Sequence, residues 1–467
     1  MIPVSVFRNH TVAVFGLART GLDAARALEA GGAEVICADD ARPRVVAAEG
    51  QGFTVGDLAD FDWSRLSALV LSPGVPLTHP APHWTVERAK AAGVEIIGDT
   101  ELFFRERAAY HPDTPVIAVT GTNGKSTTTA LLGHLLTKAG RAVSVGGNIG
   151  AAALGLDRMG DGRVYVLEMS SFQIDLTPSL EPDVGVLLNV APDHLDRHGT
   201  MEAYAAIKAR IAERAGTAVI AVDDEWTRAV ADQVAGQGRP LVRASANQPL
   251  KAGVFVREGK LVEAAHGEET EIADISAVRT LRGAHNWQNA AAAVASALAL
   301  RVDRDAVAQG LLSFPGLVHR MEPVGRIGKV LFVNDSKATN TEAASRALSS
   351  FERVYWIAGG RPKQAGLGEL APYFPRIRRA FLIGEAADDF AAALEGRVTY
   401  EISGELAVAV SRAAEEAAKE DGDEPVVLLS PACTSFDQFA DFEARGDAFR
   451  RLVSGLDDVV MADGEAA

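Results

Sequence analysis

Short apolar runs alternate with amphipathic stretches along most of the chain. The first run, Thr11–Phe15, precedes a glycine turn and a helical pattern, and two more runs follow at Glu34–Ala38 and Ala68–Leu71. Apolar runs of strand length separated by helical patterns predict parallel sheets with helices on their faces. We therefore expect a Rossmann-like unit over residues 1–108.

The same alternation continues in two further blocks. The second contains expected strands at Val116–Thr120, Val164–Leu167, Val184–Asn189 and Ala218–Val222, and a helix near 286–300 closes it. Proline and glycine interrupt the pattern at Pro315, Gly316 and Pro323. The third contains expected strands at Lys329–Asn334, Val354–Ala358, Ala380–Ile383 and Val426–Leu429. We predict an α/β fold of three domains, 1–108, 109–316 and 317–467, the last again Rossmann-like.

The composition limits the classes of partner. Of 467 residues, 48% are hydrophobic and 23% are charged, as in ordinary globular domains. Acidic residues outnumber basic ones, 62 to 46, which gives a formal charge of −16. Such a surface repels a phosphate backbone, so we do not expect a nucleic-acid partner. A local basic pocket for a small anionic molecule remains compatible with this charge.

The location is also predicted. The two cysteines, Cys37 and Cys433, are too few for a disulfide framework or a cysteine-built zinc site. The N-terminus lacks the basic and apolar regions of a signal peptide, and the longest apolar candidate, residues 289–300, is too short to span a bilayer. We expect a cytoplasmic protein that does not insert into a membrane.

The strongest local motif is Thr120-Gly-Thr-Asn-Gly-Lys-Ser-Thr127, between a predicted strand and a predicted helix. Glycines let backbone N–H groups approach phosphate oxygens, and the helix N-terminus favours an anion. Lys125 would neutralise the β/γ-phosphates, and Ser126 or Thr127 could reach Mg²⁺. The first position of the strict phosphate-loop pattern is Val119 instead of glycine. The alternative is a plain strand–turn–helix with an exposed lysine. We predict a P-loop-type ATPase domain.

A weaker motif, Gly16-Leu-Ala-Arg-Thr-Gly21, occurs in the first block. Ala18 replaces the middle glycine of a dinucleotide fingerprint, where the backbone must approach a pyrophosphate. One interpretation is a plain tight turn. The other is a site for a different nucleotide or phosphate, lined by Arg19, Thr20 and residues 39–42.

The motifs taken together resemble a known family. GTNGKST is similar to the phosphate loop of the Mur ligase and folylpolyglutamate synthetase superfamily. Further matching segments occur at Gly147-Asn148, Glu168–Gln173, Asn189–Asp196, His285–Asn289, Val318–Arg320, Asn334–Asn340, Leu429–Phe439 and 442–449. DSKATN and SPACTSFDQF resemble the Mur ligases that add D-glutamate, and the resemblance covers all three parts in the family's order.

The resemblance implies an ATP-dependent amide ligase of peptidoglycan synthesis, acting as a monomer. Its substrates would be UDP-N-acetylmuramoyl-L-alanine and D-glutamate, and ATP would convert the first substrate's carboxylate to an acyl phosphate. The first domain would bind the UDP-sugar, the central domain ATP and the last domain the amino acid.

The resemblance also assigns the catalytic and metal-binding residues. Glu168 and His194 would hold Mg²⁺ with Ser126, and Lys208 would carry a CO₂-derived carbamate that binds a second Mg²⁺. Read alone, Glu168 could cap the following helix, His194 could be structural, and Lys208 could be a solvated lysine. We expect Lys125, Glu168, His194 and Lys208 to be catalytic.

The remaining site residues fall into three groups. ATP is expected to contact Gly121, Thr122, Asn123, Gly124, Lys125, Ser126, Thr127, Asn286, Asn289, Arg320 and Asp335. Asn286 and Asn289, three residues apart, share a helix face, although helix capping would explain them as well. The UDP-sugar is expected to contact Arg19, Thr20, Asp39, Arg42, Ser72, Gly74 and Asn148. The amino acid is expected to contact Lys337, Thr339, Lys363, Ser435 and Phe442, the last of which could equally serve packing.

Three other functions compete with this prediction. A dinucleotide oxidoreductase would rest on the first unit and leave GTNGKST unused. A P-loop switch would leave DSKATN and SPACTSFDQF without a role. A folate-type polyglutamate ligase has the same chemistry but leaves the N-terminal unit unexplained.

Overall fold

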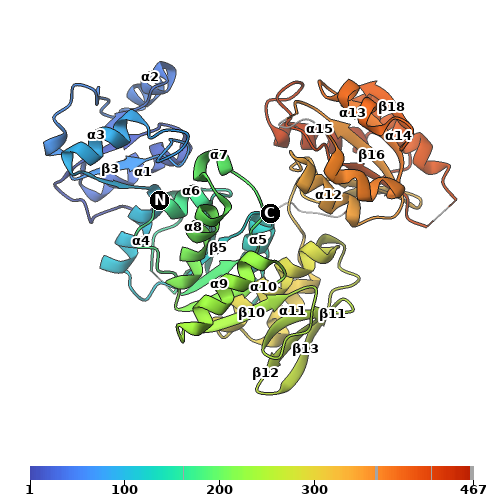
Figure 1. Cartoon of the computed structure of the whole chain (residues 1–467), viewed down its shortest axis with the longest axis horizontal. Helices are drawn as coiled ribbons and strands as arrows, with labels where there is room; N and C mark the ends of the chain where they lie inside the picture. The colour runs from blue at the N-terminus through green and yellow to red at the C-terminus, as the bar shows by residue number, and fades with distance from the viewer. Residues whose placement is uncertain (161, 363–365, 422, 463–467) are drawn as a thin grey trace. The chain divides into compact units, whose positions relative to one another are not determined.

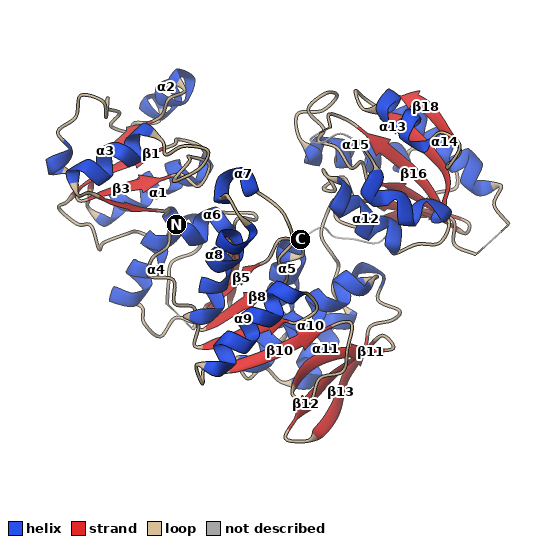
Figure 2. Cartoon of the chain, in the orientation of Figure 1, coloured by secondary structure: helices blue, strands red, loops and turns tan. Residues whose placement is uncertain are grey.

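The computed structural model describes residues 1–160, 162–362, 366–421 and 423–462. In these ranges the strands form three sheets with helices packed against them, shown in Figures 1 and 2. The predicted α/β class with a Rossmann-like unit at each end of the chain is confirmed. No helix in the described ranges is both long and apolar enough to cross a membrane.

The first sheet is parallel, with strand order β2-β1-β3-β4. Its strands are β1 (Thr11–Phe15), β2 (Glu34–Ala38), β3 (Ala68–Leu71) and β4 (Glu95–Ile97). Its helices are α1 (Arg19–Gly31), α2 (Arg42–Gly50), α3 (Trp84–Ala92) and α4 (Asp99–Tyr110). The first three strands coincide with the predicted runs, because each is a short run of buried apolar residues.

The second sheet has the order β13-β12-β11-β10-β9-β8-β5-β7-β6. Its strands are β5 (Val116–Thr120), β6 (Val143–Gly147), β7 (Val164–Glu168), β8 (Val184–Leu187), β9 (Thr217–Ala221), β10 (Leu241–Ser245), β11 (Gly253–Arg257), β12 (Lys260–Ala265) and β13 (Glu268–Asp274). Only β12 and β13 join it antiparallel. The associated helices are α5 (Lys125–Lys138), α6 (Ser171–Asp175), α7 (Leu195–His198), α8 (Met201–Glu213), α9 (Glu225–Gly236), α10 (Ala284–Ala299) and α11 (Arg304–Leu312).

The third sheet has the order β18-β17-β16-β19-β15-β14-β20, with antiparallel strands at the β14 and β20 end. Its strands are β14 (Glu322–Ile327), β15 (Val330–Asn334), β16 (Val354–Gly359), β17 (Ile377–Ile383), β18 (Tyr400–Gly404), β19 (Val426–Leu429) and β20 (Val460–Met461). Its helices are α12 (Thr341–Ser349), α13 (Ala387–Leu394), α14 (Leu406–Ala418) and α15 (Phe442–Ser454). Alternate residues of these strands point to opposite faces of the sheet and form two cores. Leu331 and Trp356 pack with α12 and α13 on one face, and Phe332 and Ile357 pack with α14 and α15 on the other.

The chain divides into two compact units. The first contains residues 1–274 and 288–312, and the second contains 275–287 and 313–467. The predicted nucleotide and UDP-sugar residues up to position 208 therefore lie together in the first unit. The domain limits at residues 108 and 316 stay predictions.

Candidate active site

The GTNGKST loop connects the fully buried strand β5 to helix α5. Gly124, the residue before the helix, has a φ of +83°, and a Cβ there would lie 2.1 Å from Oδ1 of Asn289. Glycine is therefore required at this position for both backbone conformation and space. The same contact places Asn289 against the loop, as expected for a nucleotide-binding residue.

Residues after β8 fix the shape of this loop. The Asn189 side chain accepts a hydrogen bond from the Asn123 N–H at 2.9 Å and donates one to the Asn123 carbonyl at 3.1 Å. The Thr122 hydroxyl accepts from the Ala191 N–H at 3.0 Å and lies 3.2 Å from the hydroxyl of Tyr204. The loop is thus preorganised by the protein alone.

Two lysines converge on the carbonyl of Gly121. Lys125 Nζ donates to it at 3.0 Å, and Lys208 Nζ donates to it at 2.8 Å. Lys208 is only 1% exposed, so the alternative of a solvated lysine is wrong. Burial, and then the charge of Lys125, lower the pKa of Lys208 well below that of an ordinary lysine. The loop therefore carries one cation beside an amine that is readily deprotonated.

Glu168 ends β7 and is 2% exposed. Its Oε1 accepts a hydrogen bond from Asn148 Nδ2 at 2.8 Å, and its buried Oε2 receives none from the described residues. Ser170, in a capping box with Gln173, caps α6, so the helix-cap alternative for Glu168 is wrong. A buried carboxylate oxygen without a donor is a suitable ligand for a hard cation.

His194 precedes the short helix α7 with a positive φ of 52°. Its ring meets the edge of Phe172 at 5.0 Å between centroids. Burial, and to a smaller extent the charges of Lys125 and Lys208, lower the pKa of His194, although Asp193 opposes the shift. The neutral imidazole that results is the form that binds metals.

The donors for a divalent cation are few. Among the described residues, no group of three His, Cys, Asp or Glu side chains could hold a metal ion. Mg²⁺ commonly takes one or two carboxylates and completes its coordination with waters and substrate phosphates. The donor chemistry of Glu168, His194 and Ser126 fits such a phosphate-dependent site better than a preformed cage.

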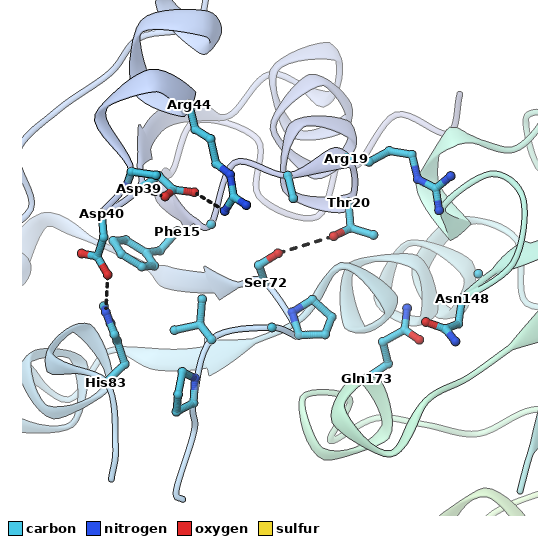
Figure 3. Close-up of a pocket in the computed structure, with 18 residues that line it drawn as sticks. Phe15, Arg19, Thr20, Asp39, Asp40, Arg44, Ser72, His83, Asn148 and Gln173 are labelled. Carbon is cyan, nitrogen blue, oxygen red and sulfur yellow. Dashed lines mark hydrogen bonds and ion pairs between the residues drawn. The ribbon is translucent and has the colours of Figure 1, made fainter. Parts of the chain in front are cut away.

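A cavity of about 660 Å³ lies between the first sheet and the start of the second within the first unit. Figure 3 shows Asp39, Asp40, Arg44 and His83 around one end and Arg19, Asn148 and Gln173 at the other. Thr20 and Ser72 lie between, with their hydroxyls 3.5 Å apart. Because Asn148 also bonds Glu168, this end of the cavity adjoins the phosphate-loop site.

The structure brings six of the seven residues predicted to contact the UDP-sugar together in this cavity. Arg19, Thr20, Asp39, Ser72, Gly74 and Asn148 all line it. Arg42 does not, whereas Arg44 does and lies 3.4 Å from Asp39. Asp40, within the expected range 39–42, also lines the cavity, as does Gln173, which ends a matching motif but was not assigned to this site. The prediction missed Phe15 and His83.

The GLARTG turn contains Gly16, with a φ of +97°, and Gly21, where a Cβ would lie 1.9 Å from the Gly16 carbonyl. The Leu17 N–H donates to the Asp39 carboxylate at 2.7 Å, and the Ala41 N–H does so at 2.8 Å. Burial opposes ionisation of Asp39, but these two backbone bonds and Arg44 outweigh it and lower its pKa. The backbone of this turn is thus hydrogen-bonded to a carboxylate of the protein itself.

In the second unit, residues predicted for ATP, Arg320 and Asp335, lie near the end of β15 together with Lys337 and Phe442, which are predicted for the amino acid. Asp335 is buried, accepts from the Ser430 hydroxyl at 2.9 Å, and has a pKa raised by burial to about 7. Lys337 Nζ lies 3.7 Å above the Phe442 ring, and the Phe442 carbonyl accepts from Ser336 at 2.8 Å. Arg320 is close enough to Asp335 to lower its pKa in part.

Other predicted residues of this unit have less defined roles. Ser435 is 1% exposed, and its hydroxyl is buried without a hydrogen-bond partner in the described ranges. The Thr339 N–H donates to the Lys337 carbonyl at 2.8 Å, which keeps the two residues in one tight turn. Asn286 donates to the Arg282 carbonyl at 2.9 Å. Lys363 lies outside the described residues.

Arg445 was missed by the sequence prediction. It is 1% exposed and donates to the carbonyls of Ser336 and Cys433 at 2.8 and 3.1 Å. It therefore joins the DSKATN and SPACTSFDQF segments on either side of the predicted amino-acid site. An arginine within a helical stretch gives no sequence signal of such burial.

Comparison with known proteins agrees with this geometry. The Mur ligase middle domain matches residues 119–297, and the Mur ligase, glutamate ligase domain matches residues 319–433. The UDP-N-acetylmuramoylalanine–D-glutamate ligase of Nitrobacter hamburgensis is 58% identical over 98% of both chains. That of Brucella suis is 55% identical over the full length of both.

Solved structures share the fold. The MurF ligase from Thermotoga maritima in complex with ADP has a TM-score of 0.58 at 17% identity and covers 97% of each chain. The UDP-N-acetylmuramate–alanine ligase from the same organism has a TM-score of 0.55 at 17% identity, covering 95% of this chain and 98% of that one. At such low identity these likenesses show the fold alone.

The chain belongs to the Mur ligase family. Within that family it lies with the UDP-N-acetylmuramoylalanine–D-glutamate ligases, and it is an ATP-dependent acid–amino-acid ligase. The oxidoreductase and P-loop switch alternatives are therefore wrong, and so is the folate-type ligase.

Proposed function

We propose that the chain joins D-glutamate to UDP-N-acetylmuramoyl-L-alanine in peptidoglycan precursor synthesis, with an acyl phosphate as intermediate. A carboxylate oxygen attacks the γ-phosphorus of ATP and ADP leaves. The amine nitrogen of D-glutamate then attacks the acyl carbon, loses a proton, and inorganic phosphate leaves. The observation that carries the proposal is the convergence of Lys125 and Lys208 on the Gly121 carbonyl.

This arrangement suits phosphoryl transfer from ATP to a carboxylate. Two anions must approach each other, so the transition state needs concentrated positive charge. Lys125 supplies it from the protein, and the N-terminus of α5 adds N–H groups directed at the phosphates. In this proposal, residues 121–127 hold the phosphates of ATP, and Asn286, Asn289, Arg320 and Asp335 are further ATP ligands.

Mg²⁺, of which we propose two ions, would supply further positive charge beside the phosphates when bound. Glu168, His194 and Ser126 would hold one of them, and the uncompensated Oε2 of Glu168 supports this assignment. Lys208 would hold the other as a carbamate. Burial lowers the pKa of its amine, which favours the uncharged nitrogen that must add to CO₂.

The three domains divide the substrates in the predicted way. Residues 1–108, with Asn148 and Gln173, would bind the UDP-sugar in the cavity of Figure 3. Residues 109–316 would bind ATP. Residues 317–467 would bind D-glutamate through Lys337, Thr339, Lys363, Ser435 and Phe442. We further propose a cytoplasmic monomer, in keeping with two buried free thiols.

The amino-acid specificity gives the decisive test of this function. Purified protein receives ATP, Mg²⁺ and UDP-N-acetylmuramoyl-L-alanine with one amino acid at a time, and phosphate release and product mass are measured. We expect product with D-glutamate, and much less with L-glutamate or D-glutamine, because buried donors would be left unpaired. Ligation of a different amino acid with D-glutamate inert would contradict the proposal.

A further inference from the structure

Arg197, which no sequence motif marked, makes an unusual set of contacts within the first unit. It lies in α7, three residues after His194. Its guanidinium donates to three consecutive backbone carbonyls, to Gly74 at 3.1 Å, Val75 at 3.1 Å and Pro73 at 3.5 Å. All of these hydrogen bonds go to one short loop, which follows strand β3 of the first sheet.

The segment that Arg197 holds is part of the cavity wall. Residues 72–76 follow β3, and all five line the cavity. A hydrogen bond of 2.9 Å from the Val75 N–H to the Ser72 carbonyl closes the segment into a turn. Because the Arg197 contacts involve backbone atoms, they restrain the turn without contributing a side chain to the cavity.

The other side of Arg197 faces the residues proposed to act in catalysis. Its guanidinium carbon lies 4.7 Å above the centre of the Phe172 ring. The Phe172 ring also contacts the ring of His194 at 5.0 Å and stacks on that of His198 at 5.2 Å. Phe172 is adjacent to Gln173, which lines the cavity. Arg197 therefore connects the cavity turn to the aromatic cluster that supports His194.

We propose that Arg197 is a positioning residue that fixes the 72–76 turn against helix α7, which directly follows His194, so that the UDP-substrate is bound with its carboxylate toward the phosphate loop. The inference rests on the proposed function of the cavity. Only a planar guanidinium can donate to three neighbouring carbonyls while stacking on an aromatic ring. A lysine could keep the charge but not this geometry.

Three variants test the proposal. Arg197→Met removes every donor and keeps much of the apolar stem, Arg197→Lys retains one cationic group, and Arg228→Met is the matched control. Arg228 is an exposed arginine of the same unit whose Nε donates to the Asp224 carbonyl at 3.1 Å, away from the cavity residues. For each variant, titration calorimetry gives the Kd for UDP-N-acetylmuramoyl-L-alanine, and steady-state kinetics give kcat and the KM for all three substrates.

We expect Arg197→Met to raise the Kd and KM for the UDP-substrate about tenfold or more, as loss of charge-assisted hydrogen bonds predicts. The KM for ATP should change less than about twofold, Arg197→Lys should be intermediate, and Arg228→Met should match the wild type. A general loss of folding would instead change the KM for all substrates or the active fraction.

Two results would overturn the inference. Equal affinity of Arg197→Met and wild type for the UDP-substrate would overturn it and leave the proposed function intact. Failure of the wild type itself to bind or ligate UDP-N-acetylmuramoyl-L-alanine would overturn both. If Arg197→Met did not fold, Arg197→Lys with wild-type affinity would likewise contradict the proposal.

Discussion

Two loops of the first unit that connect a strand to a helix differ in the charged groups to which their backbones are hydrogen-bonded. Both GLARTG and GTNGKST connect a buried parallel strand to a helix, and both contain a glycine of positive φ. The first directs backbone N–H groups at the carboxylate of Asp39, whereas the second gathers Lys125 and Lys208 on the Gly121 carbonyl. Both loops therefore have the strand–turn–helix backbone of a nucleotide site, and the charged residues next to each loop determine which ligand groups it can bind.

A buried base and a buried acid of the first unit can be compared in the same way. Lys208, beside the second loop, is buried, and its pKa is lowered. Asp99, at the start of α4 before the central sheet, is also buried, and burial raises its pKa to about 6. Both groups are displaced toward their neutral forms. The proposed carbamate uses this shift, because only an uncharged amine can add to CO₂.

The largest expected effect is that of Lys208→Ala. If Lys208 carries the proposed metal-binding carbamate, its removal should cost several kcal/mol of transition-state stabilisation and thus lower kcat by about 1,000-fold. A short carboxylic acid added to the variant should restore part of the rate by replacing the carbamate oxygens. The measurement is phosphate release with and without acetate. Near-normal turnover of the variant without any added acid would contradict the assignment.

Lys125→Ala tests the cationic loop directly. Loss of one contact to the developing charge should cost about 3–4 kcal/mol, or roughly 100- to 1,000-fold in kcat. Arg19→Ala, in the GLARTG loop, should instead raise the KM for the UDP-substrate with kcat within a few-fold. Steady-state kinetics of the two variants separate the roles. A similar loss of kcat in Lys125→Ala and Arg19→Ala would contradict the assignment of different roles to the two loops.

Asp99→Asn should reveal the buried acid through stability. The folded-state pKa of about 6 lies above the value of about 3.9 for an exposed aspartate, so the folded state binds the proton more tightly. This contribution to stability is complete below about pH 4 and is lost as the pH rises through 6. The variant should therefore gain about 1–3 kcal/mol over the wild type at pH 8 and little at pH 4. Urea denaturation at both pH values measures this, and a pH-independent difference would contradict it.

The smallest expected effect is that of Asp39→Asn. The amide has a single oxygen acceptor, so the Leu17 and Ala41 N–H groups and Arg44 cannot all keep their partner. We expect the KM for the UDP-substrate to rise about three- to tenfold, with the KM for ATP unchanged. Calorimetric titration with each ligand separately measures this. A larger change in the affinity for ATP than in the affinity for the UDP-substrate would contradict the assignment of Asp39 to the UDP-sugar site.

The strands that carry the site could be predicted because each is an apolar run closed by a motif. Thr11–Phe15 and Val116–Thr120 have the predicted limits. The antiparallel pair of β12 and β13 was not predicted, because its half-exposed residues lack a continuous apolar run. Glycine loops could be found for the same reason that they form, since few other residues adopt their conformation or fit their contacts.

Side-chain direction was less predictable. The helical pattern around Lys208 does not by itself say that this lysine faces inward, and only the family resemblance marked it. Arg44 was missed in favour of Arg42, because the phase of the short helix α2 is not evident from its sequence. Arg197 and Arg445 bind carbonyls of segments far away in the chain, a kind of contact with no local pattern.

The most direct test of the account follows one oxygen atom. UDP-N-acetylmuramoyl-L-alanine with both carboxylate oxygens labelled with ¹⁸O is ligated to D-glutamate with unlabelled ATP, and the released phosphate and the product are analysed by mass spectrometry. If the cationic loop activates the carboxylate as an acyl phosphate, each phosphate released carries one ¹⁸O and the new amide retains the other. Release of phosphate that carries no ¹⁸O would contradict the account.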